Sequence, residues 1–175
     1  GDIMQGNVIF AKTPMQLQNN VFFDVPFGSF SDEKATSWEY EPVSMMHAVT
    51  TIDQNKLDIF NIHGIWGEDG EDNSRRLAMS DVIVEQITKH NNVVLGGDFN
   101  VRPQTKTMKQ IAAHLQPAFA SNLVSTFNMK HKINPGYSVS VVDMIFVSKG
   151  MKVLQTRVSD ADVSDHKPVI ATIEI

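Results

Sequence analysis

The chain has 175 residues, of which 42% are hydrophobic and 20% are charged, and this composition suits one globular domain over residues 1–175. It contains no cysteine, which excludes a disulfide framework and a thiolate zinc site and leaves His, Asp, Glu and Asn as candidate metal ligands. The formal net charge of −5 argues against a diffuse basic surface for nonspecific nucleic-acid binding, although a local basic patch can sit on an acidic protein.

Apolar runs bounded by turn residues predict eight strands along the chain. They cover residues 7–11, 20–25, 44–52, 57–62, 93–95, 139–147, 152–158 and 169–175. Helical spacing predicts one helix over residues 74–90, capped by Asp72 or Asn73, and a shorter one from about Thr105 toward His114.

The connections between these elements indicate the fold class. The short link between 44–52 and 57–62 predicts a hairpin, and residues 57–95 form a strand–helix–strand unit long enough to join parallel strands. Many strands and two helices together predict a mixed α/β (α+β) fold, a two-sheet β-sandwich flanked by helices.

Isolated polar residues stand at the ends of the most apolar runs. They are His63, Asp98, Asn100, Asp143, Asp165 and His166. Burying such groups without partners costs roughly 1–3 kcal/mol each. Several of them in one sequence suggest that they partner one another. The other histidines, at positions 47, 90, 114 and 131, lie in strands, helix ends or a basic loop and receive no catalytic role.

The segment at residues 96–100, Gly-Gly-Asp-Phe-Asn, is suited to approach a ligand. Its glycines allow close backbone approach, and strand alternation places Asp98 and Asn100 on one side and Phe99 on the other. A carboxylate beside an amide can accept a proton from water and hold a phosphoryl oxygen. The alternative is an ordinary turn with Asn100 as a turn former or helix cap.

The pair Asp165-His166 precedes the last predicted strand, and alternation sends its two side chains to opposite faces. An oriented imidazole can donate a proton or bind phosphate, and Asp143 is the candidate carboxylate that orients His166. The alternatives are an exposed acidic turn for the pair and a core imidazole satisfied by the backbone for His63.

Five segments carry a family resemblance when they are taken in order. They are residues 6–10 (GNVIF), 61–63 (NIH), 97–100 (GDFN), 142–148 (VDMIFVS) and 164–169 (SDHKPV). Together they resemble the endonuclease/exonuclease/phosphatase superfamily over nearly the whole chain. The resemblance implies a deoxyribonuclease I-like fold and a divalent-metal-dependent phosphoesterase that hydrolyses phosphodiesters or phosphomonoesters, as a nuclease or as a small-molecule or lipid phosphatase.

The resemblance also implies roles for three polar residues on the central strands. Asp98 would activate or position the attacking water. Asn100 would orient that water or hold transition-state oxygens. His63 would act on the phosphate or the leaving group, as a second active-site histidine.

Further roles follow from the same resemblance for the C-terminal segments. Asp143 would steady His166, which would stabilise charge on the phosphoryl group or donate a proton. Asp165 would belong to a site for Mg²⁺ or Mn²⁺. These parts suit phosphoryl transfer in general, where a cation and fixed donors offset charge on the equatorial oxygens.

The chain departs from the family pattern at its start. Family members carry a strand–helix–strand unit with a metal-binding Glu before the segment matched by residues 6–10, so we expect an N-terminally truncated chain with weak Mg²⁺ binding and weak turnover. A missing strand would also expose one sheet edge, which invites homodimerisation. The main alternative is a catalytically inactive binding or scaffolding module that keeps the fold. A third candidate is a metal-binding protein with no hydrolytic role.

Partners and location are expected from the same features. The acidic loop 66–72, followed by Arg75 and Arg76, suits a phosphorylated small molecule or a nucleic-acid end more than long duplex DNA. No apolar run could span a bilayer and no secretory signal is visible, so we expect no membrane span and cytoplasmic residence.

Overall fold

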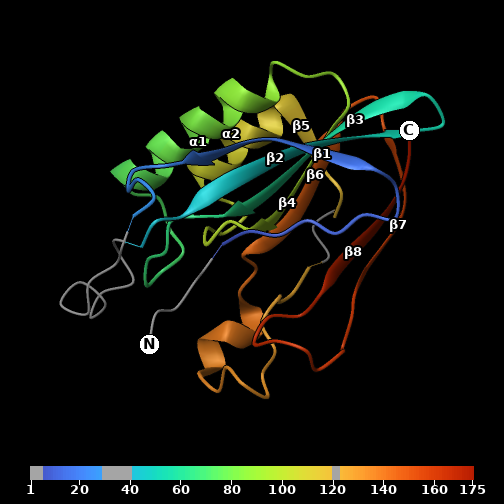
Figure 1. Ribbon diagram of the computed structural model, residues 1–175. Helices are drawn as coiled ribbons and strands as arrows, with labels where there is room; N and C mark the ends of the chain where they lie inside the picture. The colour runs from blue at the N-terminus through green and yellow to red at the C-terminus, as the bar shows by residue number, and fades with distance from the viewer. Residues whose placement is uncertain (1–5, 29–40, 120–122) are drawn as a thin grey trace.

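The apolar runs assemble into two β-sheets (Figure 1). The computed structural model describes residues 6–28, 41–119 and 123–175. The larger sheet has the strand order β1-β2-β3-β4-β6-β5, and β7 and β8 form the second sheet. The strands are β1 (Met15–Phe22), β2 (Ser44–Ile52), β3 (Asn55–His63), β4 (Val93–Asp98), β5 (Leu115–Pro117), β6 (Asp143–Ser148), β7 (Lys152–Val158) and β8 (Val169–Glu174).

Both predicted helices are confirmed, although the helix predicted over residues 74–90 ends at Ile87. Side-chain caps define the starts of both helices. In α1 (Ser74–Ile87), the side chain of the N-cap Asn73 accepts a hydrogen bond from the backbone N–H of Arg76. In α2 (Lys106–His114), Thr105 caps in the same way. A short 3₁₀ helix, η2 (Pro135–Val139), precedes β6. Neither α1 nor α2, the two α-helices of the described residues, has the length and apolar character that a membrane span requires.

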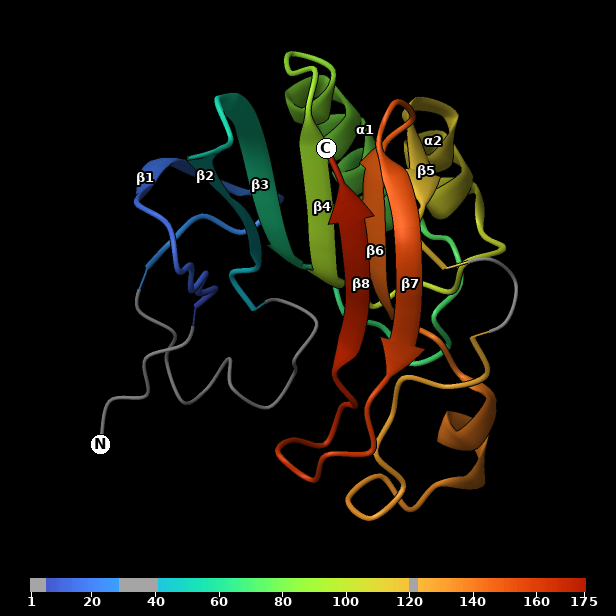
Figure 2. The same ribbon diagram turned by 90° about the vertical axis from the view of Figure 1, so that its right-hand side faces the viewer.

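The molecule has three layers, with the larger sheet in the middle. Both helices cover one face of this sheet, and β7 and β8 lie against the other face (Figure 2). Met79 and Ile111 of the helices join Phe60 and Leu95 of the sheet in one core cluster. A second cluster, between the sheets, includes Val147. This arrangement confirms the predicted sandwich flanked by helices.

The two predicted connections around β3 are also confirmed. β2 and β3 form an antiparallel hairpin, whose turn places Asp53 and Gln54 at positive φ. β3 and β4 are parallel and are joined through α1. As a result, β3 and β4 end at the same edge of the sheet.

The strand predicted over residues 7–11 is wrong. This segment is held by side chains instead of a backbone ladder: Asn7 Nδ2 donates to the Ser44 carbonyl at 2.7 Å, and Asn61 Nδ2 donates to the Val8 carbonyl at 2.9 Å. Side-chain amides therefore hold Asn7 and Val8 in place without a strand ladder.

Other strand boundaries differ from the prediction for identifiable reasons. The strand predicted over 20–25 corresponds to β1, which starts earlier, at Met15, and ends at Phe22. Its first residues are exposed and largely polar, so they lack the apolar alternation that would have predicted them. The strand predicted over 139–147 starts only at Asp143. The backbone N–H of Val142 donates to Thr126 Oγ1, and the preceding residues form η2. The short strand β5 was not predicted.

Candidate active site

Three neighbouring strands place a polar side chain at one level of the larger sheet. His63, the last residue of β3, is in register with Asp98, the last residue of β4. Asp98 is in turn in register with Asp143, the first residue of β6. By strand alternation all three lie on the face that carries Ile59 and Ile145, which packs against the second sheet. The parallel crossover and the antiparallel β6 thus bring distant residues to one rim.

His166 reaches this rim from the segment before β8. Its Nδ1 lies 2.8 Å from Asp143 Oδ2, and an isolated β-bridge to Phe127 holds its backbone. Burial lowers the pKa of the His166 imidazole, but the hydrogen bond and charge of Asp143, with the charge of Asp98, outweigh it and raise the pKa overall. The sequence-based pairing of Asp143 with His166 is therefore present, and His166 lines the cleft described below.

Asp98 follows a glycine that no other residue could replace without strain. Gly97 has φ +138°, and a Cβ there would lie 2.1 Å from the Ile62 carbonyl oxygen. Asp98 Oδ1 accepts a hydrogen bond from the Asn100 backbone N–H at 2.7 Å. Burial and the neighbouring charge of Asp143 raise the pKa of Asp98 to about 7.

Asn100 stands in a left-handed turn after β4, with φ +55°. Its side-chain Nδ2 donates to the Gly64 carbonyl at 2.9 Å, which ties the turn to the residue after His63. Phe99 points the other way and is fully buried in the core cluster. The predicted division, with Phe99 inward and the polar pair toward the cleft, agrees with this geometry.

His63 lines the cleft and is not a core imidazole. Burial lowers its pKa, the positive charge of His166 lowers it further, and the charge of Asp143 acts in the opposite direction. His63 and His166 therefore have pKa values shifted in opposite directions within one site. In such a pair, one imidazole gives up its proton more readily and the other holds its proton more firmly than a free histidine does.

Asp165 lies at the rim and is about half exposed. Its Oδ2 lies 2.9 Å from Lys132 Nζ, and its side chain is 49% exposed. The hydrogen bond from the Lys132 ammonium group is the largest cause of the lowered pKa of Asp165. Its role as a metal ligand stays a prediction.

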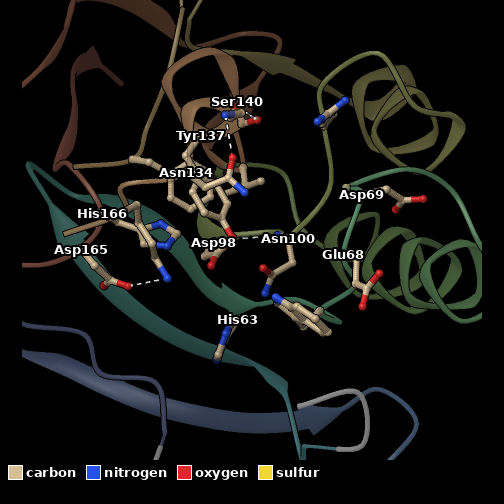
Figure 3. A pocket seen from close by; sticks show the side chains of 18 of the residues that line it. His63, Glu68, Asp69, Asp98, Asn100, Asn134, Tyr137, Ser140, Asp165 and His166 are labelled. Atoms are coloured by element: carbon tan, nitrogen blue, oxygen red, sulfur yellow. Dashed lines mark hydrogen bonds and ion pairs between the residues drawn. The ribbon is translucent and has the colours of Figure 1, made fainter. Parts of the chain in front are cut away.

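These side chains surround a cleft of about 720 Å³. Figure 3 shows His63, Asp98, Asn100 and His166 around one hollow, with Asp165 beside His166. Trp66, Glu68 and Asp69, from the acidic loop expected to meet the substrate, also line the cleft, and so do Glu41, Arg102, Lys132, Asn134 and Tyr137, which the sequence analysis did not name. The acidic loop after His63 was a visible signal for some of them. Lys132, Asn134 and Tyr137 come from irregular segments, where no periodicity marks them.

Arg76 holds the loop that forms one wall of the cleft. Its fully buried guanidinium donates to the carbonyls of Ile65 at 3.1 Å, Gly67 at 3.2 Å and Asn100 at 2.8 Å. It also donates to the Glu71 carbonyl and to the exposed Asp69 carboxylate. This arginine was noted in the sequence only as a local cation, and its structural role was missed.

The donor set fits a hard divalent cation. Ligand atoms of Asp98, Asp143 and His166 all lie within 4.8 Å of one another. Carboxylate oxygens are the ligands that Mg²⁺ prefers. Burial and the neighbouring charge of Asp143 both disfavour the ionised form of Asp98, and a bound cation would offset both effects.

The chain belongs to the endonuclease/exonuclease/phosphatase family, whose model matches residues 1–166. No curated protein sequence matches it. Among solved structures, a protein of unknown function from Enterococcus faecalis V583 is similar, with 21% identity and a TM-score of 0.64 over 91% of this chain and 67% of that one.

Two further solved structures have names that indicate an activity or a ligand. A mannosyl-6-phosphatase from Bacteroides thetaiotaomicron VPI-5482 has 20% identity and a TM-score of 0.61, over 92% of this chain and 67% of that one. TDP2 from D. rerio, complexed with a single-strand DNA product, has 15% identity and a TM-score of 0.63, over 92% and 69%. At these identities the likeness shows the fold, and this chain spans about two-thirds of the length of these structures.

Proposed function

We propose that the chain carries the catalytic cleft of a divalent-metal-dependent phosphoesterase, which hydrolyses a phosphomonoester or phosphodiester. The observation that carries this proposal is the convergence of His63, Asp98 and Asp143 at one level of three strands, with His166 held 2.8 Å from Asp143. Membership in the endonuclease/exonuclease/phosphatase family supports it.

In this proposal Asp98, His166 and His63 have different roles in phosphoester hydrolysis. Asp98, whose Oδ1 accepts from the Asn100 N–H, keeps its second oxygen for water, and a carboxyl with a pKa near 7 is suited to take a proton. His166, oriented at Nδ1 by Asp143, presents Nε2 as a donor to a phosphoryl or leaving-group oxygen. His63, with its lowered pKa, supplies a neutral imidazole beside them.

The carboxylates of Asp98 and Asp143 would hold Mg²⁺ or Mn²⁺, with Asp165 available at the rim, which leaves His166 to donate to the phosphate. A bound cation would supply positive charge next to the phosphoryl oxygens. The chain's own residues orient the water, donate to the phosphate and partly shield the half-buried Asp98 from bulk solvent.

The charge of the cleft favours a small phosphorylated substrate. Carboxylates line it at Glu41, Glu68, Asp69, Asp98 and Asp165, and cationic side chains at Arg102 and Lys132. A cleft with more acids than cations suits one phosphate group on a compact molecule or a nucleic-acid end, and disfavours a long polyanion. Trp66 and Tyr137 add flat surfaces for a sugar or base next to that phosphate.

The test is hydrolysis of a panel of sugar phosphates, phosphodiesters and short single- and double-stranded nucleic acids, with Mg²⁺, Mn²⁺ or EDTA. Asp98→Asn and His166→Gln should each lower kcat/KM by roughly 10²- to 10⁴-fold. The matched controls are Asp53→Asn, in the β2–β3 turn, and His114→Gln, at the exposed end of α2. Because the chain spans about two-thirds of the length of its structural relatives, we expect slow turnover, and the assay should use a high enzyme concentration.

Two outcomes would contradict the proposal. One is turnover that survives both Asp98→Asn and His166→Gln. The other is a complete lack of turnover together with saturable binding of a phosphorylated panel member in the cleft. The second result would establish the inactive binding module instead.

A further inference from the structure

A second cluster of metal-ligand side chains lies away from the cleft. Asp58 precedes His63 by five residues on β3, about 16 Å along the strand. It also points to the opposite face, toward the helices. On that face Asp58 meets His47 of β2 and His90 of the α1–β4 connection.

The local structure explains why these three residues meet. His47 is in register with Phe60, so Asp58, two residues before Phe60, is its diagonal neighbour on the same face. The α1–β4 connection brings His90, whose backbone N–H bonds to the Ile87 carbonyl. The His47 ring stacks on Phe60, with centroids 4.2 Å apart and planes 7° apart, which fixes the direction of its Nε2.

The two imidazoles converge on a single carboxylate oxygen. His47 Nε2 is 2.8 Å and His90 Nδ1 is 3.0 Å from Asp58 Oδ1. The side chains of His47 and Asp58 are nearly buried, with 7% and 4% exposed, whereas that of His90 is 20% exposed. A metal ion would therefore meet two buried ligands, His47 and Asp58, and would reach them from solvent past the more exposed His90.

The ligand set is one that zinc uses. One ligand atom from each of His47, Asp58 and His90 can be chosen so that all lie within 4.8 Å of one another. Two imidazoles and one carboxylate make a three-residue zinc set, and water completes the tetrahedron in such sites. Nitrogen donors favour Zn²⁺ over Mg²⁺, which prefers oxygen. This donor set thus differs from that of the cleft.

We propose that His47, Asp58 and His90 form a zinc-binding site, separate from the cleft, that ties the α1–β4 connection to the β2–β3 hairpin. Two nitrogens and one oxygen would hold the ion, with water from the His90 side as the fourth ligand. Zinc would bind the folded chain and not the unfolded chain, because the unfolded chain does not hold these three residues together. Zinc binding would therefore raise the free energy of unfolding.

One neighbouring charge opposes the ion and supplies a sharp test. Lys56 Nζ lies 3.5 Å from Asp58 Oδ1, but its side chain is 62% exposed and is free to turn into solvent. An ammonium group near a divalent ion weakens its binding. Lys56→Ala should therefore tighten zinc binding by about three- to tenfold. If the three residues only form hydrogen bonds and bind no zinc, Lys56→Ala will produce no change in zinc binding.

The experiment uses the His166→Gln chain, so that zinc in the cleft contributes little. ZnCl₂ is titrated by calorimetry, CoCl₂ by the visible absorption of tetrahedral Co²⁺, and thermal unfolding is followed with and without zinc. His90→Gln is the test variant because His90 is the most exposed ligand. It should weaken zinc binding by at least roughly 100-fold and abolish the tetrahedral spectrum. His114→Gln, at an exposed helix end, is the matched control and should change neither.

The results of these titrations either support or overturn the zinc site. A tetrahedral Co²⁺ spectrum and zinc-dependent stabilisation that are lost in His90→Gln, kept in His114→Gln and strengthened in Lys56→Ala support the site. The absence of zinc binding in the His166→Gln chain, or binding that His90→Gln leaves unchanged, would overturn it. Folding of each variant is verified by circular dichroism in the absence of metal.

Discussion

Replacing Arg76 by methionine should destabilise the chain and loosen one wall of the cleft. The guanidinium is fully buried and donates to four backbone carbonyls and to the Asp69 carboxylate. Methionine approximates the length of the aliphatic stem but has no donor. The loop from residue 65 to residue 71 would therefore lose the hydrogen-bonding centre around which it is folded.

The expected magnitude follows from those bonds. A hydrogen bond to a charged group contributes about 1.5–3 kcal/mol, so four carbonyls give an upper sum of about 6–12 kcal/mol. Removing the buried charge also relieves its desolvation, and the loop can admit water to the freed carbonyls. We therefore expect a loss of about 3–5 kcal/mol in the free energy of unfolding, where a typical domain has about 5–15 kcal/mol in total.

The assay is urea unfolding followed by far-UV circular dichroism, with amide hydrogen exchange over residues 65–71. With an m-value of about 2 kcal/mol/M, the unfolding midpoint should fall by about 1.5–2.5 M. Exchange in the loop should speed up more than in α2. The control is Arg157→Met on an exposed position of β7, which should change the stability by less than about 0.5 kcal/mol.

A loss below about 1 kcal/mol with unchanged loop exchange would refute the reasoning. Such a result would mean that the loop is held by other contacts and that the buried guanidinium contributes little net free energy.

Three further predictions concern the cleft and the sheet edges. Gly97→Ala should destabilise by at least about 3 kcal/mol, because its Cβ would lie 2.1 Å from the Ile62 carbonyl, whereas Gly96→Ala meets ordinary contacts and serves as the matched control in thermal unfolding. The folded-state pKa of Asp98, about 7, exceeds its ordinary 3.8, so its contribution to stability is present at low pH and is lost as pH rises from about 4 to about 7. Asp98→Asn should therefore stabilise the metal-free chain by about 1–3 kcal/mol at pH 8 and hardly at pH 4, and equal effects at both pH values would contradict the charge argument. Since β7 and β8 pair only with each other among the described strands, we propose that their outer edges support a homodimer, and a monomeric mass in light scattering at high concentration would count against it.

Local signals in the sequence were sufficient for most secondary structure. Residues 44–52 and 152–158 were predicted with the observed bounds of β2 and β7, because their apolar runs end at clear turn residues. The expected cap, Asp72 or Asn73, marked the start of α1, and the structure selects Asn73. Signals of this kind depend on neighbours in the chain and are readable without the fold.

The order of the five family-like segments predicted the family. Five of the six polar residues noted at strand ends line one cleft, and their catalytic roles stay predictions. The pairing of Asp143 with His166 could be expected because an imidazole that orients toward substrate needs a carboxylate partner. Their arrival at one rim, however, required a parallel crossover and an antiparallel return that the spacing alone leaves open.

Only the tertiary structure decided the contacts between residues that no periodicity connects. Where a strand was predicted, the side chain of Asn7 donates a hydrogen bond to the Ser44 carbonyl. Arg76, which was expected to be a local cation for the substrate, is fully buried and holds a loop together. His47 and His90, unremarkable in the sequence, meet on Asp58 through strand register and a helix end. Sequence spacing encodes which face of an element a side chain occupies, but which faces meet, and at what register, is set by packing of the whole chain.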